Sequence, residues 1–450
     1  MKRIDLPEGA ALIINRLKSH GYEAYIVGGC VRDALMGREP NDWDVCTSAL
    51  PAQIMAVFSH YPVIETGVQH GTVTVLVRGT GYEITTYRVD GAYSDGRHPD
   101  KVSFVSSLAE DLSRRDFTIN AMAYAPDEGL VDLFGGQEDI QNRVIRCVGT
   151  PSHRFCEDYL RILRTMRFAS TLGFAIEQET MQAMLAHFQG LKQVSMERIC
   201  TEFRKMVVGE TFPEIVDRCR DIIGFLIPEF VPCFALGLTG DRQADDVWSH
   251  ILQTMTYYHT FQFRDELVAL ALFFHDIGKP KVCTEDEQGH RSFKGHAGAG
   301  ADMTNEILRR MKFDNASRER IVELVRYHTN RGEATAPAAR RLLNKLGEAQ
   351  VRRLFAVQRC DLAAHVPEQR AKKALQLSRM EALVDEIIKR DQCYELKKLA
   401  VKGKDLIEAG FRPGRQMGEI LQSLLEAVMD ERVPNEKEAL LALARDLCKE

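Results

Sequence analysis

The chain has 450 residues, of which 45% are hydrophobic and 27% charged, and its formal net charge is −5. This composition is typical of a water-soluble protein of several domains, and the acidic balance excludes an overall electrostatic attraction to nucleic acid. No stretch approaches the roughly 20 apolar residues of a membrane span, and Asp5 and Glu8 stand where a signal peptide would be apolar, so we expect a cytoplasmic protein without membrane contact.

Cysteine usage indicates a reducing compartment. Eleven cysteines lie scattered from Cys30 to Cys448, and none belongs to a CxxC pair. Reduced thiols that serve as small apolar residues fit this pattern better than a disulfide framework or a zinc site. Redox chemistry is therefore not expected.

Residues 1–145 hold most of the strand-like patterns. Alternating and β-branched residues in 23–29, 70–79 and 82–89 predict a sheet. From Arg154 onward, apolar residues recur at spacings of three and four, as on one face of a helix. We therefore expect an α+β head with a mixed sheet, followed by an all-helical region.

Two aspartates one residue apart lie in the segment 28–45, GGCVRDALMGREPNDWDV. On a strand, Asp42 and Asp44 would point to one side while Trp43 points toward the core. Two carboxylates so close repel each other unless a cation lies between them, and Mg²⁺ takes oxygen ligands from carboxylates and substrate phosphates. Glu83, on a candidate neighbouring strand, would be a third carboxylate. A DxD that only caps a loop and faces solvent is the alternative.

The start of the same segment suits a nucleoside triphosphate. Gly28 and Gly29 allow the backbone to approach phosphates closely, and Arg32 offers a forked donor from the first helical turn. Together with these three residues, the two aspartates are better explained as a metal-binding pair than as a solvated loop end.

A second group of polar residues lies in 114–124, RRDFTINAMAY. Arg115, Asp116 and Asn120 offer donors and acceptors suited to phosphate and ribose, while neighbouring apolar residues can pack behind them. In isolation, the segment is also compatible with an amphipathic surface helix.

A third group lies in 157–168, EDYLRILRTMRF, for which the spacing predicts a helix. At about 100° per residue, Asp158, Arg161 and Arg164 fall within an arc of about 120°, and apolar residues form another face. Asp158 and Arg161 would then form hydrogen bonds to a ligand. Alternatively, they would form an ordinary helical ion pair that stabilises the helix by a few tenths of a kcal/mol.

These segments, in this order, resemble the class II tRNA nucleotidyltransferases, the family of CCA-adding enzymes, over nearly the whole chain. The family's GGxVRD motif is matched by 28–33, its DxD by 42–44 and its next motif by 114–124. Residues 132–146 match the segment that joins head to neck, and 157–168 match the helix that recognises nucleotides.

The resemblance implies template-independent addition of CCA to the 3′ end of tRNA from CTP and ATP, on a head like that of DNA polymerase β. Two Mg²⁺ ions held by Asp42 and Asp44 would activate the tRNA 3′-hydroxyl and neutralise the leaving pyrophosphate. The pair Asp158 and Arg161 would present hydrogen bonds to the base edge. The implied catalytic residues are Asp42, Asp44 and Glu83, and the implied nucleotide-binding residues are Gly28, Gly29, Arg32, Arg115, Asp116, Asn120, Asp158, Arg161, Arg164 and Arg167.

The segment 88–102 contains Gly91 and Gly96 among mixed charges and is expected to be a mobile loop. Its counterpart in the family helps the switch from C to A addition, and its full length argues against a relative that adds only C. A plain exposed hairpin is the alternative.

Two other functions are compatible with parts of this pattern. One is a bacterial poly(A) polymerase built on the same head, against which the intact loop and the tail argue. The other is an HD metallophosphohydrolase whose head has become an RNA-binding module, against which the complete DxD and the segment 114–124 argue.

In the helical half, FFHDIGKP (273–280) resembles the signature of HD phosphohydrolases. Such sites collect His and Asp from several helices, and a transition metal such as Ni²⁺ or Mn²⁺ suits these ligands. The implied ligands are His250, His275, Asp276 and Asp361, with His296 and His328 as candidates for a second metal. A catalytic HD site and an HD fold kept as a structural module are both compatible with the sequence.

We expect four regions: a nucleotidyltransferase head (1–145), a helical neck and body for nucleotide recognition and RNA binding (146–237), an HD domain (238–365) and a C-terminal tail (366–450). Within the tail, 410–445 has a Pro-Gly turn followed by two amphipathic helices. It resembles the family's element that grips the tRNA elbow, and a bundle cap without RNA contact is the alternative.

Overall fold

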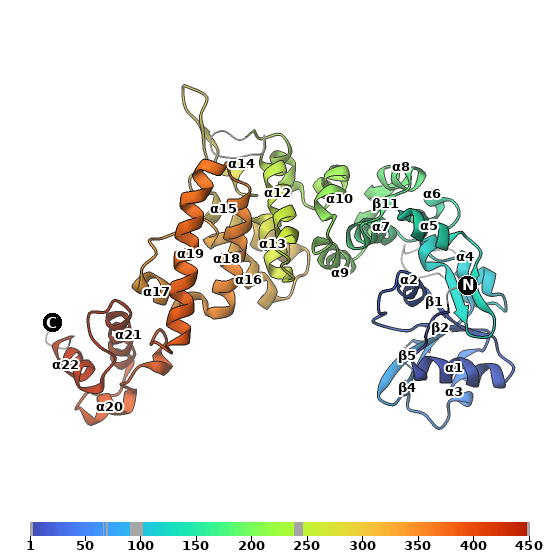
Figure 1. Ribbon diagram of the computed structural model, residues 1–450, viewed down its shortest axis with the longest axis horizontal. Helices are drawn as coiled ribbons and strands as arrows, with labels where there is room; N and C mark the ends of the chain where they lie inside the picture. Colours follow the sequence, from blue (N-terminus) through green and yellow to red (C-terminus); the bar gives the residue numbers. More distant parts are fainter. Residues whose placement is uncertain (1–2, 66, 69–70, 91–101, 238–245, 448–450) are drawn as a thin grey trace. The chain divides into compact units, whose positions relative to one another are not determined.

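The computed structural model describes residues 3–65, 67–68, 71–90, 102–237 and 246–447. The chain forms two compact units, Met1–Leu226 (unit 1) and Ile227–Glu450 (unit 2). Figure 1 shows strands gathered in the N-terminal half and helices throughout the C-terminal half. The predicted fold class, an α+β head followed by a helical region, is confirmed.

A seven-stranded mixed sheet forms the centre of the head, with strand order β3-β4-β5-β2-β1-β8-β9. Strands β2 and β5 run parallel, and the other neighbouring pairs run antiparallel. The alternation that predicted strands is present in β4, where Val73, Val75 and Val77 are buried between half-exposed residues. The strands of the sheet are β1 (Ala24–Val27), β2 (Val45–Thr47), β3 (Val63–Ile64), β4 (Thr72–Val77), β5 (Thr80–Thr86), β8 (Met122–Ala125) and β9 (Gly129–Asp132).

Both faces of the sheet are covered. Ile26 of β1 belongs to a large core with residues of three helices, whereas its neighbour Tyr25 packs on the opposite face with Leu112. A separate two-stranded sheet leads into and out of residues 91–101. The helices of the head are α1 (Glu8–Ser19), α2 (Gly29–Leu35), α3 (Pro51–Val57), α4 (Leu108–Ser113) and α5 (Gly136–Asn142), and the separate strands are β6 (Arg88–Asp90) and β7 (Val102–Phe104).

The rest of unit 1 is helical and corrects one prediction. The expected continuous helix from Glu157 to Phe168 is interrupted at Asp158, whose backbone is extended (φ −147°, ψ 103°). The Asp158 carboxylate accepts a hydrogen bond from the Leu160 N–H at 3.0 Å, and such a local bond competes with helix continuation. The elements are α6 (Pro151–Glu157), α7 (Leu160–Leu172), α8 (Gln178–His187), α9 (Met196–Val207), α10 (Phe212–Arg218), α11 (Arg220–Leu226), β10 (Val144–Ile145) and β11 (Ala175–Ile176).

Unit 2 is built around α13 (Glu266–Phe274), whose residues from Val268 to Phe274 are all buried. A helix that is apolar all round belongs in the middle of a helical array, and α13 contacts three other helices, α12, α16 and α18. The remaining elements of this array are α12 (Val247–Thr260), α14 (Lys279–Val282), α15 (His296–Arg310), α16 (Asn315–Tyr327), α17 (Ala336–Leu346), α18 (Glu348–Ala363), α19 (Pro367–Lys389) and the hairpin of β12 (Thr284–Glu285) and β13 (Arg291–Ser292).

The chain ends in three further helices, α20 (Gly403–Glu408), α21 (Arg415–Met429) and α22 (Lys437–Leu447). The predicted Pro-Gly turn and two helices of 410–445 are confirmed, with Gly414 directly before α21. Among the described residues, no helix combines the length and the apolar composition that a membrane crossing requires.

Candidate functional site

The three carboxylates Asp42, Asp44 and Glu83 come from two neighbouring chain segments. Asp42–Asp44 lie directly before β2 and not within a strand, which corrects the predicted setting. The segment is tied to β1, since the Asp44 carbonyl accepts from the Val27 N–H at 3.0 Å. The parallel register of β2 with β5 pairs Val45 with Ile84, and this brings Glu83 beside Asp44.

The charges of these carboxylates affect one another. The pKa of Asp44 is raised to about 6, chiefly by burial and also by the negative charges of Asp42 and Glu83, while Arg115 acts in the opposite direction. Carboxylates that repel each other in this way are suited to share a divalent cation. Trp43 is partly buried against the core of the head, on the side predicted for it.

The glycine turn brings the backbone next to cationic side chains. Gly28 has a positive φ of 82°, and a Cβ there would lie 3.1 Å from Arg115 Nη1. One turn into α2, Arg32 donates from Nη1 to Asn120 Oδ1 at 2.6 Å. Its Nε and Nη2 each lie 2.9 Å from an oxygen of Asp33, which fixes the plane of the guanidinium.

A buried aspartate that the sequence did not single out positions the arginine pair. Asp111 is fully buried in α4, and its carboxylate lies 2.7 Å from Arg114 Nη2 and 3.2 Å from Arg115 Nη2. Burial acts to raise the pKa of Asp111, but the charges of the two arginines outweigh it and the pKa is lowered. The spacing of three and four residues on a helix was a usable signal for this cluster.

Asp116 and Asn120 connect the head to α7. Asp116 accepts a forked pair of bonds from Arg164, at 2.9 Å from Nε and 2.5 Å from Nη2, and a third at 3.2 Å from Asn120. Burial raises the pKa of Asp116, but Arg164 and the hydrogen bonds outweigh this and hold it at about 2. Arg167 pairs with Glu202 of α9 at 2.5 Å.

Asp158 and Arg161 each have a partner that the sequence did not indicate. Arg198 of α9 makes a forked contact with the Asp158 carboxylate, at 2.7 and 3.2 Å. Arg161 donates to Glu157 at 2.5 Å and to two backbone carbonyls, one of them that of Arg114 at 3.2 Å. The two side chains are therefore oriented from several directions at the break between α6 and α7.

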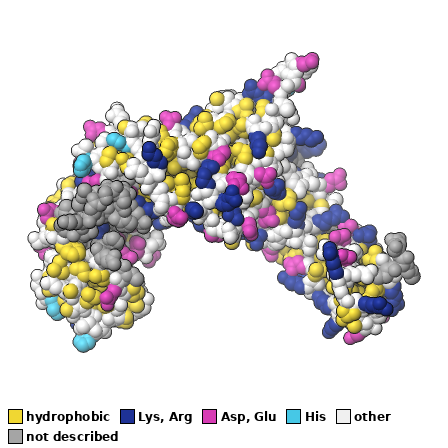
Figure 2. All heavy atoms as spheres, turned by 180° about the vertical axis from the view of Figure 1, so that it is seen from behind, with side chains coloured by type: hydrophobic (Ala, Val, Ile, Leu, Met, Phe, Trp, Pro, Cys, Tyr) yellow, Lys and Arg dark blue, Asp and Glu magenta, His cyan; other side chains and the backbone are white. Residues whose placement is uncertain are grey.

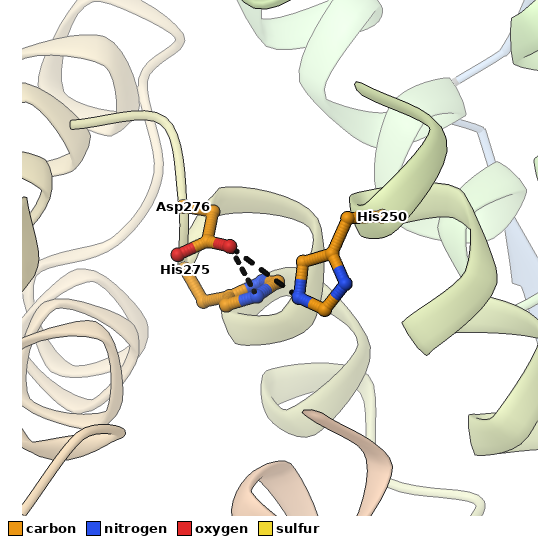
Figure 3. A group of neighbouring side chains, drawn as sticks. All are labelled: His250, His275 and Asp276. Carbon is orange, nitrogen blue, oxygen red and sulfur yellow. Dashed lines mark ion pairs between the residues drawn. The ribbon is translucent and has the colours of Figure 1, made fainter. Parts of the chain in front are cut away.

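The predicted HD residues assemble into a buried cluster in unit 2. His275 and Asp276 follow directly on the apolar helix α13, and His250 comes from α12 (Figure 3). Asp276 Oδ2 lies 3.2 Å from His275 Nε2 and 3.4 Å from His250 Nε2. Asp361 of α18 joins them, with Oδ1 3.2 Å from His250 Nε2. These four residues are at most 2% exposed.

A second pair of histidines faces the other oxygen of the same aspartate. Asp276 Oδ1 lies 3.3 Å from His296 Nε2 and 3.7 Å from His328 Nε2. In His275, His296 and His328, Nδ1 lies 2.7 or 2.8 Å from a backbone carbonyl and so carries the proton. Nε2 of each ring then faces a carboxylate oxygen, an arrangement suited to a shared cation.

Three more residues complete the surroundings of the cluster and were missed in the sequence. His365 Nε2 lies 3.4 Å from Asp361 Oδ1, Arg331 forms an ion pair with Asp361 Oδ2, and Lys279 Nζ lies 2.5 Å from Asp276 Oδ2. His365 follows Asp361 by four residues and lies just beyond the end of α18, and this spacing was the available signal.

The chain is also held closely around the cluster by backbone packing. Gly278 lies two residues after Asp276, and a Cβ there would be 2.4 Å from both the carbonyl oxygen of His296 and the nitrogen of Gly300. The start of α15, which carries His296, therefore contacts the backbone after Asp276 directly. The predicted loop 88–102 falls largely on residues 91–101, which lie outside the described part of the chain.

Three family models match consecutive parts of the chain. Residues 24–146 match the poly A polymerase head domain, 173–229 match the probable RNA- and SrmB-binding site of polymerase A, and 286–444 match the putative domain 2 of tRNA nucleotidyltransferase. Together they cover most of both units.

Relatives match over the full length. The chain is 34% identical to the CCA-adding enzyme of Levilactobacillus brevis, with 98% of each chain covered, and 33% identical to that of Limosilactobacillus reuteri, with both chains fully covered. It is also similar to the crystal structure of the Bacillus stearothermophilus CCA-adding enzyme in complex with CTP, with a TM-score of 0.69 and 30% identity. That comparison covers 98% of this chain and 97% of the other.

Proposed function

Because the chain belongs to the family of CCA-adding enzymes, we propose that it adds C, C and A to the 3′ end of tRNA from CTP and ATP, without a nucleic-acid template. The observation that carries this proposal is the convergence of Asp42, Asp44 and Glu83 beside the glycine turn and Arg115. A cation site next to a phosphate-binding turn is the arrangement that nucleotidyl transfer requires.

The nucleotidyltransferase head indicates a divalent metal, and we propose Mg²⁺ held by Asp42 and Asp44 with support from Glu83. When bound, this metal lowers the pKa of the attacking hydroxyl and neutralises charge on the phosphates. Arg32 and Arg115 hold the triphosphate, and their positions are already determined by Asp33, Asn120 and Asp111.

Asp158 and Arg161 select the base. A carboxylate has about four acceptor sites, so Asp158 can accept the exocyclic amino group of cytosine or adenine in addition to its bonds from Arg198 and Leu160. Arg161 has five N–H donors and can present one to the neighbouring ring nitrogen. Uracil and guanine present a carbonyl and an N–H at these places, and each mismatch costs about 1–3 kcal/mol.

The test of this function uses tRNA that lacks its CCA end. With CTP alone the tRNA gains two C residues, with ATP alone it gains none, and with both nucleotides it gains CCA and extension stops. A run of A residues would identify a poly(A) polymerase instead, and no incorporation of either nucleotide would contradict both functions.

We propose a second activity for the cluster around Asp276, supported by the two pairs of histidines that face its two oxygens. The nitrogen and oxygen donors fit one or two transition metal ions such as Ni²⁺ or Mn²⁺, which when bound activate water for attack on a phosphoester. His250, His275, Asp276 and Asp361 would hold the first ion, and His296 and His328 with Asp276 the second.

The test of the second activity combines metal analysis with hydrolysis of a 2′,3′-cyclic phosphate. His275→Ala with Asp276→Ala is expected to lose the metal and the hydrolysis while CCA addition continues. Purified protein that retains no such metal and hydrolyses no phosphoester would identify the cluster as structural.

We also propose the division into head (1–145), neck and body (146–237), HD domain (238–365) and tail (366–450), with the tail as a tRNA-binding element. Figure 2 shows Lys and Arg side chains gathered over the C-terminal end of the chain. Lys397, Arg415 and Arg432 are strongly exposed in this part, as contacts to phosphates require.

A further inference from the structure

A cavity of about 350 Å³ lies between α17, α18 and α19, next to the turn 330–332, and we call it the α17–α19 pocket. Its volume is at the lower end of the range for small-ligand sites, roughly 300–1,000 Å³, which suits a mononucleotide-sized molecule. One wall is apolar and is formed by Leu342, Phe355, Leu377 and Met380.

The pocket is preformed because its turn is fastened to two helices. Gln358 of α18 donates to the Asn330 carbonyl at 2.8 Å. Gln376 of α19 donates to the Gly332 carbonyl at 2.8 Å and to the Arg331 carbonyl at 3.1 Å. A ligand therefore does not have to order the turn when it binds, which favours affinity.

The polar side chains of the pocket are cationic or neutral. Arg331, Arg341 and Lys345 line it, and among its described lining residues none is Asp or Glu. Arg341 forms an ion pair with Asp430, and Lys345 lies 4.6 Å from the centre of the Tyr327 ring. Arg331 Nε is buried and has no hydrogen-bond partner within the described part of the chain.

We propose that the α17–α19 pocket binds a nucleoside monophosphate. The phosphate pairs with the three cations, of which the arginines offer forked donors. The base lies against Phe355 and the apolar wall, and amide groups such as that of Asn330 can both donate to and accept from its edge. Nucleotide binding at this place is separate from the substrate site of the head, which lies in the other unit.

Arg331 connects the pocket to the metal cluster. Arg331 lines the pocket, and its side chain forms the ion pair with Asp361 Oδ2. A phosphate that attracts Arg331 leaves more negative charge on Asp361, so the cluster binds a cation more tightly, and by reciprocity the metal favours the nucleotide. This coupling, unlike binding in the pocket, rests on the proposed metal site.

Binding is tested by titrating the full-length protein with AMP, CMP, GMP and UMP in EDTA, which removes metal-dependent binding in the head. Lys345→Glu is expected to weaken binding about tenfold or more, and Ala338→Trp is expected to abolish it by filling the pocket. Lys192→Glu is a charge-matched control at an exposed position in unit 1, and it should bind like wild type. Retained CCA addition shows that each variant is folded.

Three outcomes would overturn the pocket proposal. They are the absence of binding by all four nucleotides, binding that survives both pocket variants but is lost in Asp158→Ala, and inorganic phosphate that binds as tightly as AMP. Equal affinity for inorganic phosphate and AMP would show that the base contributes nothing to binding.

The coupling is tested by measuring Mn²⁺ affinity with and without saturating AMP. Tighter Mn²⁺ binding with AMP in wild type, and no such change in Arg331→Lys, is expected. Equal Mn²⁺ affinity in both conditions would overturn the coupling alone. Failure to bind Mn²⁺ at all would contradict the proposed metal site, whereas the titration in EDTA judges the pocket independently.

Discussion

Asp42 and Asp44 are the residues on which nucleotide addition should depend most. Replacing either by Ala removes a proposed metal ligand without changing a helical surface, so we expect incorporation to fall to background while tRNA affinity changes little. Primer extension on tRNA without CCA and a tRNA-binding titration measure the two quantities. Lys192→Ala, at an exposed position, is the control. Wild-type turnover in either aspartate variant would remove these residues from the active site.

Asp111 determines where Arg114 and Arg115 point, although it is too deeply buried to touch a substrate. Asp111→Asn keeps the shape but removes the charge, so Arg115 should be less firmly placed. We expect the KM for CTP and ATP to rise about tenfold, with a smaller change in kcat and none in tRNA affinity.

The matched control for Asp111→Asn is Asp127→Asn. Asp127 also pairs with a cation, Lys18, but it lies on the surface of the head. If the two variants had the same KM values, Asp111 would have only a structural role, and a parallel loss of tRNA affinity would indicate general unfolding.

Asp116 makes stability depend on pH in a defined range. Its pKa is about 2 in the folded chain against 3.8 ordinarily, so its ionised form is favoured by folding. This contribution, roughly 2 kcal/mol, is present above about pH 4 and is lost as the pH falls toward 2. The difference in unfolding free energy between wild type and Asp116→Asn should therefore shrink over that range. If this difference in unfolding free energy stayed constant between about pH 5 and about pH 2.5, the pH dependence could not be assigned to Asp116.

At the scale of elements, the break between α6 and α7 is the feature that presents Asp158. Asp158→Ala should lower the incorporation of CTP and ATP, because the acceptor for the amino group is lost. The ratio of CTP and ATP incorporation to UTP and GTP incorporation should therefore fall. Arg198→Ala should reduce discrimination among the four nucleotides in the same way but to a smaller extent, and Arg198→Lys should retain part of the discrimination that Arg198→Ala loses. Steady-state incorporation of all four nucleotides measures this, with Lys192→Ala as control. Unchanged discrimination in Asp158→Ala would make the segment a packing element only.

Elements whose signal is local could be predicted, and those decided by distant partners could not. β4 and β5 follow from alternation along a few residues, and α13 follows from an uninterrupted apolar run. The interruption at Asp158 depends on its own side-chain bond to Leu160 N and on Arg198, which is 40 residues away in sequence. Spacing alone cannot indicate such a partner.

The residues of the two candidate sites also divide into those that the sequence indicated and those that only the structure shows. Resemblance to a family indicated residues with distinctive motifs, such as Asp276 and His250, and the structure brings them together. Asp111, His365 and Arg331 belong to no quoted motif. Spacing relates Asp111 to its arginines and His365 to Asp361, but burial gives these pairs their roles, and Arg331 contacts Asp361 from 30 residues away in sequence. Burial of an isolated charged residue is decided by tertiary packing and is weakly encoded in local pattern.

At the scale of the whole molecule, the two proposed metal sites lie in different units and use different donors. The head offers carboxylates, and the cluster offers mainly imidazoles. After EDTA treatment, we expect Mg²⁺ to restore CCA addition but not phosphoester hydrolysis, and Ni²⁺ or Mn²⁺ to restore hydrolysis. Parallel assays of one metal-free preparation measure this. Restoration of both activities by Mg²⁺ alone would contradict the separation.

Gly278 is a position outside the His and Asp cluster at which a substitution would disrupt that cluster. Since its backbone touches that of His296 and Gly300, the smallest added side chain would separate α15 from the segment that follows Asp276. Retention of the proposed metal site in diverging lineages thus depends on glycine at this position as much as on the histidines themselves. On this proposal, a single Gly278→Ala substitution in a lineage would be enough to lose the metal, with the codons of all the ligand residues still intact.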